Sequence, residues 1–232
     1  MNTLIEILIV LLFLLFFSFI SLRKKSLDLN GVIIGSVIGI TIYFFGRNTV
    51  VGGLNAFFFI ALFYVVADLG TRYGRNKREK ETEKRTTGNV LGNSLAAVIA
   101  LGLGSVIGFF SAVSSALADT LSSEIGMLSR KKPVLITTFK EVPTGTDGGV
   151  TSLGTIAALL GAVIIGLAYF VFFNDALVAL IVIMAGVIGS TVDSLLGAIF
   201  ERKKLLSNTW VNFLSCGSAA VAGFLLLKLM TG

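Results

Sequence analysis

The chain has 232 residues, of which 55% are hydrophobic and only 14% are charged, and its mean hydropathy is +0.92. Soluble domains carry about 25% charged residues, so this composition predicts an integral membrane protein. Histidine is absent, which excludes histidine general bases and zinc sites built from imidazole. The single cysteine, Cys216, lies in an apolar stretch, so the sequence holds no disulfide framework and no cysteine metal cluster.

Six apolar runs predict membrane-spanning helices, which need about 20 mainly apolar residues each. They cover residues 3–22, 31–46, 50–70, 151–173, 176–199 and 210–230. The first run is longer than the apolar segment of a signal peptide, and its basic residues follow it instead of preceding it. We therefore expect it to stay in the chain as a helix with its N-terminus outside.

The stretch from Asn89 to Leu128 fits either one long helix or two spans that turn near residues 104–108. Two spans give eight helices and place 17 of the 19 Lys and Arg residues on one side of the membrane. These residues lie in segments 23–30, 71–88, 129–150 and 200–209. One long helix would divide the basic residues 11 to 8. Since cytoplasmic loops are enriched in Lys and Arg, eight spans are favoured over seven, with both termini outside.

The predicted fold is therefore an all-α, multi-pass helix bundle in the cell membrane, a single domain over residues 1–232. Segment 71–88 is expected to be a basic cytoplasmic loop, and segment 129–150 a glycine-rich cytoplasmic loop at the active site. Residues 89–130 and 149–204 read alike, because each has a small-residue helix, a helix with the motif D-[TS]-L and a basic cluster. They form either a parallel internal repeat, with a site at its interface, or a likeness of composition alone.

Two intramembrane aspartates mark a candidate site, since buried carboxylates are costly unless they face the protein interior or a wet cavity. Asp119 and Asp193 lie in the cytoplasmic halves of their predicted helices, and Asp119 shares a helical face with Ser123. Oxygen ligands of this kind suit Mg²⁺, which takes one or two carboxylates and substrate phosphates. Glu124 is either a further metal ligand or the partner of a basic loop residue. The simpler alternative is that each aspartate only hydrogen-bonds to a neighbouring helix.

The segment from Lys140 to Thr155, KEVPTGTDGGVTSLGT, is the candidate phosphate-binding loop. Its glycines permit positive φ and expose backbone amides, and it leads into a helix N-terminus, which attracts anions. The residues expected to bind a nucleotide here are Lys140, Thr144, Gly145, Thr146, Asp147, Gly148 and Gly149. The loop is not a Walker motif, because no GK[ST] follows the glycines. A plain glycine-rich turn is the alternative.

Asparagines near helix starts add polar groups at the same membrane boundary. Asn89 and Asn93 share one helical face, and Asn208 and Asn212 repeat this spacing near the start of the last predicted helix. Together they suit a nucleotide or head group, although a single asparagine is more often a helix cap. Lys84 and Arg85 precede Asn89 and are the candidates for neutralising phosphate charge during transfer. The other charges of this basic segment are expected to be solvated or to attract anionic lipid.

Carboxylates, exposed amides and basic side chains at one boundary are typical of phosphoryl transfer, which depends on positioning and charge neutralisation. The absence of histidine favours an acceptor that is already ionised, such as a phosphate. An alcohol acceptor would need a base, and Asp119 or Asp193 would have to serve. Nucleic acid binding is not expected.

Five segments, in the order KRTTGNVLGN, ADTLSSEIG, PTGTDGGVTSLGT, GSTVDSLLGA and VNFLS, resemble the membrane-embedded phytyl-phosphate kinase family. The resemblance covers about residues 84–220. It implies a CTP-dependent kinase that converts a prenyl monophosphate, of the phytyl or geranylgeranyl type, to the diphosphate with Mg²⁺. It also implies roles for Asp119, Glu124 and Asp193, and for the loop from Thr144 to Gly149. The loop has TDGG where relatives have TNGG, so Asp147 adds a carboxylate.

Other functions remain open from the sequence. A transporter or channel also uses intramembrane carboxylates and glycine-rich helices, and a structural scaffold is a further alternative. The expected partners are the membrane, a nucleotide and a prenyl phosphate lipid, and a homo-oligomer is possible through the Gly and Ala faces. The choice between CTP and ATP and the length of the prenyl chain stay open.

Overall fold

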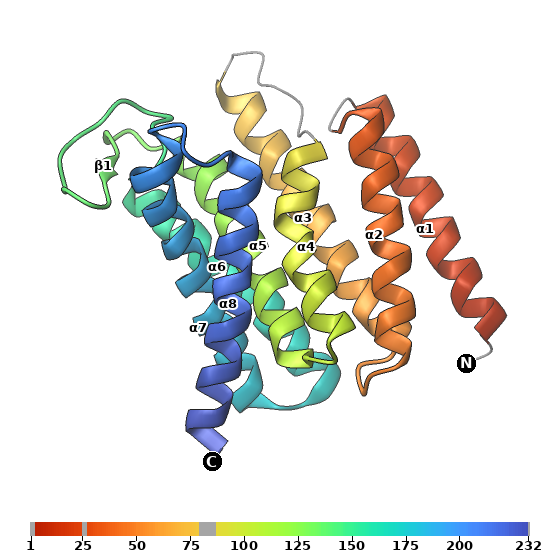
Figure 1. Cartoon of the computed structure of the whole chain (residues 1–232). Coiled ribbons are helices and arrows are strands. Elements are labelled where there is room, and N and C mark those ends of the chain that lie inside the picture. The colour runs from red at the N-terminus through yellow and green to blue at the C-terminus, as the bar shows by residue number, and fades with distance from the viewer. Residues whose placement is uncertain (1–2, 25–26, 79–86, 232) are drawn as a thin grey trace.

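The computed structural model describes residues 3–24, 27–78 and 87–231, and within them eight α-helices form one bundle (Figure 1). They are α1 (Thr3–Arg23), α2 (Leu29–Arg47), α3 (Gly53–Arg78), α4 (Thr87–Gly102), α5 (Val106–Gly126), α6 (Ser152–Phe173), α7 (Ala176–Leu196) and α8 (Asn208–Thr231). Seven are long and apolar enough to cross a membrane, and α4 is a shorter apolar helix. The predicted eight-helix fold is confirmed.

The turn between α4 and α5 is the feature that distinguishes eight helices from seven. Ser105 begins α5 as its N-cap, and its Oγ accepts a hydrogen bond from the Gly108 amide at 3.3 Å. Serine is a preferred N-cap because it satisfies an amide that has no partner within the helix. The stretch 89–128 is therefore two antiparallel helices, as the distribution of basic residues predicts.

One end of the bundle, which we call the loop end, carries residues 127–151 and 202–207 (Figure 1). There α1 and α3 end and α2 and α4 begin, so the helix ends that flank the predicted basic segments lie at this end. The start of α1 and the end of α8 lie at the opposite end. This arrangement agrees with the topology predicted from the basic residues.

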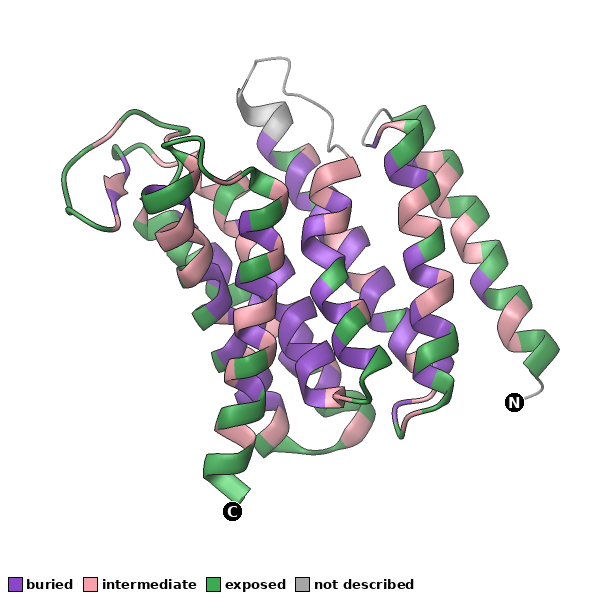
Figure 2. Cartoon of the chain, viewed as in Figure 1, coloured by how far each residue is buried: buried purple, intermediate pink, exposed green. Residues whose placement is uncertain are grey.

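Helix α5 forms the centre of the bundle, with 14 of its 21 residues buried, whereas α1 has two buried residues, Val10 and Ser21 (Figure 2). Small residues let the neighbouring helices approach α5 closely, because a Cβ added to Gly161 of α6 would lie 2.9 Å from the Ala118 Cα. The lipid-facing surface of α1 is mostly apolar and exposed. The bundle thus buries α5 and leaves α1 at its edge.

The prediction of a loop over residues 71–88 is wrong in its first part, because α3 continues to Arg78. Asp68 and Arg72 pair one turn apart, which stabilises the helix beyond its apolar part. Lys and Arg are also good helix formers, so a basic sequence does not end a helix. The predicted site residues Lys84 and Arg85 lie outside the described residues.

The segment 129–150 contains a small sheet that the sequence analysis did not predict. Strands β1 (Val134–Leu135) and β2 (Gly149–Val150) pair antiparallel, with Val134 opposite Val150. The Val142 amide donates to the Pro133 carbonyl at 2.9 Å, and the Ile136 amide donates to the Gly148 carbonyl at 3.0 Å. These hydrogen bonds give the predicted glycine-rich loop a defined shape beside the helix ends.

The sequence predicts a helix over residues 176–199. In the structure α7 ends at Leu196 and is followed by a π-helical turn, η1 (Gly197–Glu201). The Arg202 amide donates to the Gly197 carbonyl, five residues back, at 3.0 Å. Single π-turns within helices often occur at functional sites because they redirect the side chains that follow. Here the turn carries Glu201.

Candidate functional site

A polar pocket of about 240 Å³ lies at the loop end, between the end of α5, the start of α6, the end of α7 and the start of α8. The 129–150 segment closes it from the side. Its charged and polar lining residues are Asp119, Ser122, Ser123, Thr144, Thr146, Asp147, Thr151, Asp193, Ser194, Glu201 and Asn208. Glycines 126, 145, 148, 149, 154 and 197 supply most of the remaining lining.

Asp119 of α5 and Asp193 of α7 face each other in this pocket, close enough for their carboxyl groups to interact. The Ser215 hydroxyl of α8 donates to the Asp193 Oδ2 at 3.1 Å, which orients that carboxyl group. Ser123 also lines the pocket, and its hydroxyl donates to the Asp119 backbone carbonyl at 2.7 Å. The structure therefore brings together the two aspartates that the sequence singled out.

The two halves of the proposed repeat run in the same direction. Helices α5 and α7 both end at the pocket, and α6 begins there. Each half contributes one aspartate, as a site at a repeat interface requires. The orientation fits parallel repeats, and duplication itself stays a hypothesis.

The glycine-rich turn holds its shape through its own hydrogen bonds. The Thr146 amide and hydroxyl both donate to the Pro143 carbonyl, at 3.2 and 2.7 Å, and the Gly149 amide donates to the Thr146 carbonyl at 2.9 Å. Gly145 and Gly148 have φ of +87° and +74°, which favour glycine. Within the described chain the amides of Gly145, Asp147 and Gly148 donate no hydrogen bond, so they are free to bind a ligand.

Gly148 also holds the turn against η1. A Cβ at this position would collide with the backbone of Ala198, so only glycine permits the approach. On the other side of the pocket, the Thr151 hydroxyl accepts the Gly154 amide at 3.0 Å and caps α6. The start of α6 therefore points its positive dipole end at the cavity, as expected for an anion site.

Glu201 and Asn208 line the pocket. The sequence indicated Asn208 only as one of several asparagines near helix starts, and it did not indicate Glu201. Glu201 begins the basic sequence ERKK, which reads as a solvated connection between two helices. Its position in the pocket depends on η1. The sequence does contain a signal for Glu201, because it is a charged residue at the end of an apolar run, eight positions after Asp193.

An asparagine cluster links α4 to this part of the pocket. The side-chain amides of Asn89 and Asn212 both donate to the Asn208 Oδ1, each at 3.3 Å. The Asn208 side chain lies close enough to Glu201 to interact with its carboxyl group. Because its oxygen accepts from two amides, the Asn208 NH₂ group is the part that can face the carboxylate. The cluster therefore places an amide donor beside Glu201.

The pocket is acidic. Asp119, Asp147, Asp193 and Glu201 line it, and no Lys or Arg does so among the described residues. Partial burial raises the pKa of Asp147 above the usual value for an aspartate, so its charged form is disfavoured without a compensating cation. A phosphate would meet repulsion here unless a cation accompanied it. The donor set therefore fits a hard divalent cation such as Mg²⁺.

Three predicted ligands are not assembled as a set. Within residues 3–24, 27–78 and 87–231 no group of three acidic, cysteine or histidine side chains is arranged to hold a metal ion. Glu124 lies outside the pocket lining. It follows Asp119 by five residues, which is about 140° around a helix and turns it to another face. Of the predicted metal set of Asp119, Glu124 and Asp193, the pocket therefore brings together the two aspartates.

Other predicted binding residues also lie outside the lining. Lys140 is exposed, and its carbonyl accepts the Leu135 amide at 2.9 Å within the hairpin. Asn93 is buried between α4 and α8, where its carbonyl is 3.9 Å from the Cys216 Sγ. Asn89 and Asn212 lie outside the pocket lining, and both donate to Asn208, which is part of it. These side chains support the site or lie apart from it.

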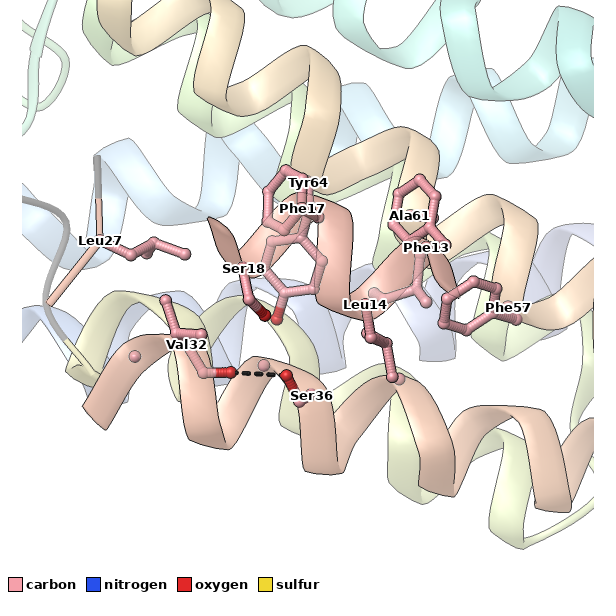
Figure 3. Close-up of a pocket in the computed structure, with 14 residues that line it drawn as sticks. Phe13, Leu14, Phe17, Ser18, Leu27, Val32, Ser36, Phe57, Ala61 and Tyr64 are labelled. Atoms are coloured by element: carbon pink, nitrogen blue, oxygen red, sulfur yellow. Dashed lines mark hydrogen bonds between the residues drawn. The ribbon is translucent and has the colours of Figure 1, made fainter. Parts of the chain in front are cut away.

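A second cavity lies between α1, α2 and α3, and it is apolar (Figure 3). Its volume is only about 30 Å³, and the Ser36 hydroxyl at its wall donates to the Val32 carbonyl at 2.9 Å. Phe13, Phe17 and Tyr64 supply aromatic walls. It holds no carboxylate, so the polar pocket is the better candidate for chemistry.

The fold and the pocket define a multi-pass integral membrane protein with a polar site at the ends of its helices. Residues 12–220 match the family described as integral membrane protein DUF92, and the chain belongs to this family. No solved structure matches the chain significantly.

Relatives of the chain include proteins of Methanocaldococcus jannaschii and Arabidopsis thaliana. An uncharacterized membrane protein of Methanocaldococcus jannaschii is 34% identical, and the alignment covers 97% of this chain and 96% of the relative. Protein PGR of Arabidopsis thaliana is 32% identical over 79% of this chain and 75% of its own length. The chloroplastic protein VTE6 of Arabidopsis thaliana is 33% identical over 52% of this chain and 37% of its own length. The family relationship predicted from the five motifs is confirmed.

Proposed function

We propose that this protein is a kinase that transfers a phosphoryl group from a nucleoside triphosphate, with CTP favoured, to a prenyl monophosphate. The observation that carries the proposal is the pocket itself, where paired carboxylates face free backbone amides and a helix N-terminus at the membrane boundary. The similarity to VTE6 adds support, as does the resemblance of the five segments to those of the phytyl-phosphate kinase family. The distribution of basic residues favours a pocket that faces the cytoplasm.

Asp119 and Asp193 are the residues that would hold Mg²⁺ in this scheme. When bound, Mg²⁺ supplies the positive charge that allows phosphates to enter an acidic pocket. The amides of Gly145, Asp147 and Gly148 would orient the phosphate oxygens. The prenyl tail would remain in the bilayer while its phosphate reaches the pocket.

The reaction needs little proton transfer. An oxygen of the acceptor monophosphate attacks the γ-phosphorus, and the bond between this phosphorus and the β-γ bridging oxygen breaks. The products are the prenyl diphosphate and the nucleoside diphosphate. Because the acceptor oxygen is already ionised near neutral pH, no base is required, which agrees with a pocket that has no histidine.

A nucleotide-by-substrate matrix tests the function. Purified protein in lipid vesicles is mixed with Mg²⁺, CTP or ATP, and geranylgeranyl phosphate or its alcohol. We expect the diphosphate from the monophosphate with CTP. The proposal would be contradicted if no combination of nucleotide and acceptor gave a product.

The paired aspartates give a sharper test. We expect Asp119→Asn and Asp193→Asn each to lower the turnover rate about 100-fold, because each removes charge stabilisation at the reacting phosphates. Asp175→Asn is a matched control, since Asp175 caps α7 at the opposite end of the bundle and accepts the Val178 amide at 3.0 Å. Unchanged rates in both pocket variants would contradict the metal assignment.

Cation transport is the second candidate, because an acidic pocket without a lining Lys or Arg among the described residues also suits a bare divalent cation. The two functions differ in their need for nucleotide. A transporter would be stabilised against heat by the divalent cation alone. The kinase would gain further stabilisation when CTP is added with Mg²⁺.

A further inference from the structure

The hairpin of the 129–150 segment carries an exposed aromatic side chain at its turn. Phe139 is 78% exposed and has a φ of +55°. Its amide donates to the Leu135 carbonyl at 2.8 Å, and the Leu135 amide donates to the Lys140 carbonyl at 2.9 Å. The turn is therefore held in one shape that presents the phenylalanine outward.

The fold does not account for this residue. Leu135 is 5% exposed and already supplies the apolar contact inside the hairpin. The Phe139 ring has no aromatic neighbour among the described residues. A left-handed φ suits glycine or asparagine, and a bulky side chain is uncommon there. A large aromatic group held outward in this conformation indicates a contact with something outside the chain.

The position of the hairpin points to the bilayer. The segment projects sideways from the bundle at the level of the helix ends (Figure 1), where lipid head groups surround a membrane-spanning protein. It leads through β2 directly into α6, whose Ile156 and Leu160 are exposed on the lipid-facing surface. Aromatic side chains are enriched at this depth of a membrane.

The charges of the hairpin agree with this position. Lys131, Lys132 and Lys140 are exposed on the same segment, as is Arg130. Glu141 is the exposed acidic residue there, and its Oε2 lies 3.9 Å from the Lys132 Nζ. The excess of basic side chains complements anionic lipid head groups.

We propose that the turn from Leu135 to Lys140 is an interfacial anchor: Phe139 inserts among the head groups of an anionic bilayer and the neighbouring lysines pair with lipid phosphates. Strands β1 and β2 connect this anchor to the glycine-rich turn, so it holds one wall of the pocket at the membrane surface. The anchor does not depend on the proposed kinase reaction.

Tryptophan fluorescence tests the anchor. The chain has one tryptophan, Trp210, so Phe139→Trp in a Trp210→Phe background places a single reporter at the turn. The protein is reconstituted in vesicles of phosphatidylcholine and phosphatidylglycerol, with and without bromine on the acyl chains. Glu141→Trp in the same background is the control, because Glu141 is a charged, exposed side chain beside Lys132.

We expect brominated lipid to quench Phe139→Trp about twofold more strongly than Glu141→Trp, and aqueous acrylamide to quench it less, as for an interfacial aromatic group. The difference should shrink in vesicles without phosphatidylglycerol. Equal quenching of both variants by acrylamide, with no effect of bromine, would overturn the anchor. Protection from acrylamide without quenching by bromine would also overturn it and indicate a second protein copy instead.

A second measurement covers the case in which the tryptophan disturbs the turn. A nitroxide attached to Phe139→Cys reports collision with oxygen, which concentrates in lipid, or with a water-soluble nickel complex. Cys216 is buried and does not compete for the label. Greater access to the nickel complex than to oxygen would contradict the proposal. Neither measurement uses nucleotide, so the result is independent of the kinase assay.

Discussion

Glu201 illustrates how a single residue gains a role from its surroundings. In the sequence it begins a basic connection, and in the structure it lines the pocket beside Asn208. Asn208 is held by Asn89 and Asn212, so the starts of α4 and α8 together place an amide beside this carboxylate. Supporting hydrogen bonds of this kind commonly tune the ligands that they orient.

We predict that Glu201→Gln weakens Mg²⁺-dependent thermal stabilisation, with about a tenfold higher Mg²⁺ concentration needed for half of the effect. Asn208→Ala should act in the same direction, because it removes the polar side chain that lies beside Glu201 in the pocket. Glu141→Gln is the control, since Glu141 is exposed and lies outside the pocket. A shift as large in the control as in Glu201→Gln would contradict a specific role.

Gly148 permits a test of the contact between the glycine-rich turn and η1. Gly145→Ala and Gly148→Ala both force a side chain into positive φ, which costs about 1–2 kcal/mol. Only Gly148→Ala also brings a methyl group into the Ala198 backbone, whereas the Gly145 position is open. Gly148→Ala should therefore lower the thermal midpoint in detergent clearly more than Gly145→Ala. Equal midpoints would show that the turn does not pack on η1 as described.

At the scale of elements, glycines and small residues determine how the helices pack around α5. A Cβ on Gly189 of α7 would lie 2.6 Å from the Ser115 Cβ of α5 and 2.8 Å from the Ala219 Cβ of α8. Three helices therefore meet at one glycine. Within a membrane such close approach replaces the hydrophobic effect as a source of stability between helices.

Two glycines in helix interiors form a matched pair for testing this packing. Gly189→Ala should destabilise the bundle by about 1–3 kcal/mol, because the added methyl group overpacks the contact among α5, α7 and α8. Gly217→Ala in α8 should be neutral or slightly stabilising, because a Cβ there meets no atom within 4 Å and alanine favours a helix. Thermal or denaturant unfolding in detergent measures both. Similar losses of stability in the two variants would contradict the close packing described at Gly189.

At the scale of the whole molecule, the pocket and the turn with Phe139 lie at one end, where α1 and α3 also end, and α1 begins and α8 ends at the other (Figure 1). The same end therefore combines a polar site with the surface expected to meet anionic lipid. Transfer to a lipid phosphate would need this placement, since the acceptor head group lies at the same depth.

We predict that this end faces the cytoplasm, because it carries most of the basic residues. Lys203→Cys should react with a membrane-impermeant maleimide only in inside-out vesicles, and Thr231→Cys only from the outer side. The buried Cys216 provides an unreactive background. Labelling of both variants from the same side would contradict the topology.

The sequence by itself determined the number of helices, their direction and the pair of aspartates. Membrane thickness sets the length of an apolar span, basic residues report its orientation, and a carboxylate within an apolar run is conspicuous because burial is costly. Only the tertiary structure decided that Glu201 and Asn208 enter the pocket while Glu124 and Lys140 lie outside it. Those positions depend on a π-turn, a small sheet and glycine contacts between distant segments. Such contacts leave no periodic pattern in the sequence, because each is made by two segments whose relative placement the whole bundle determines.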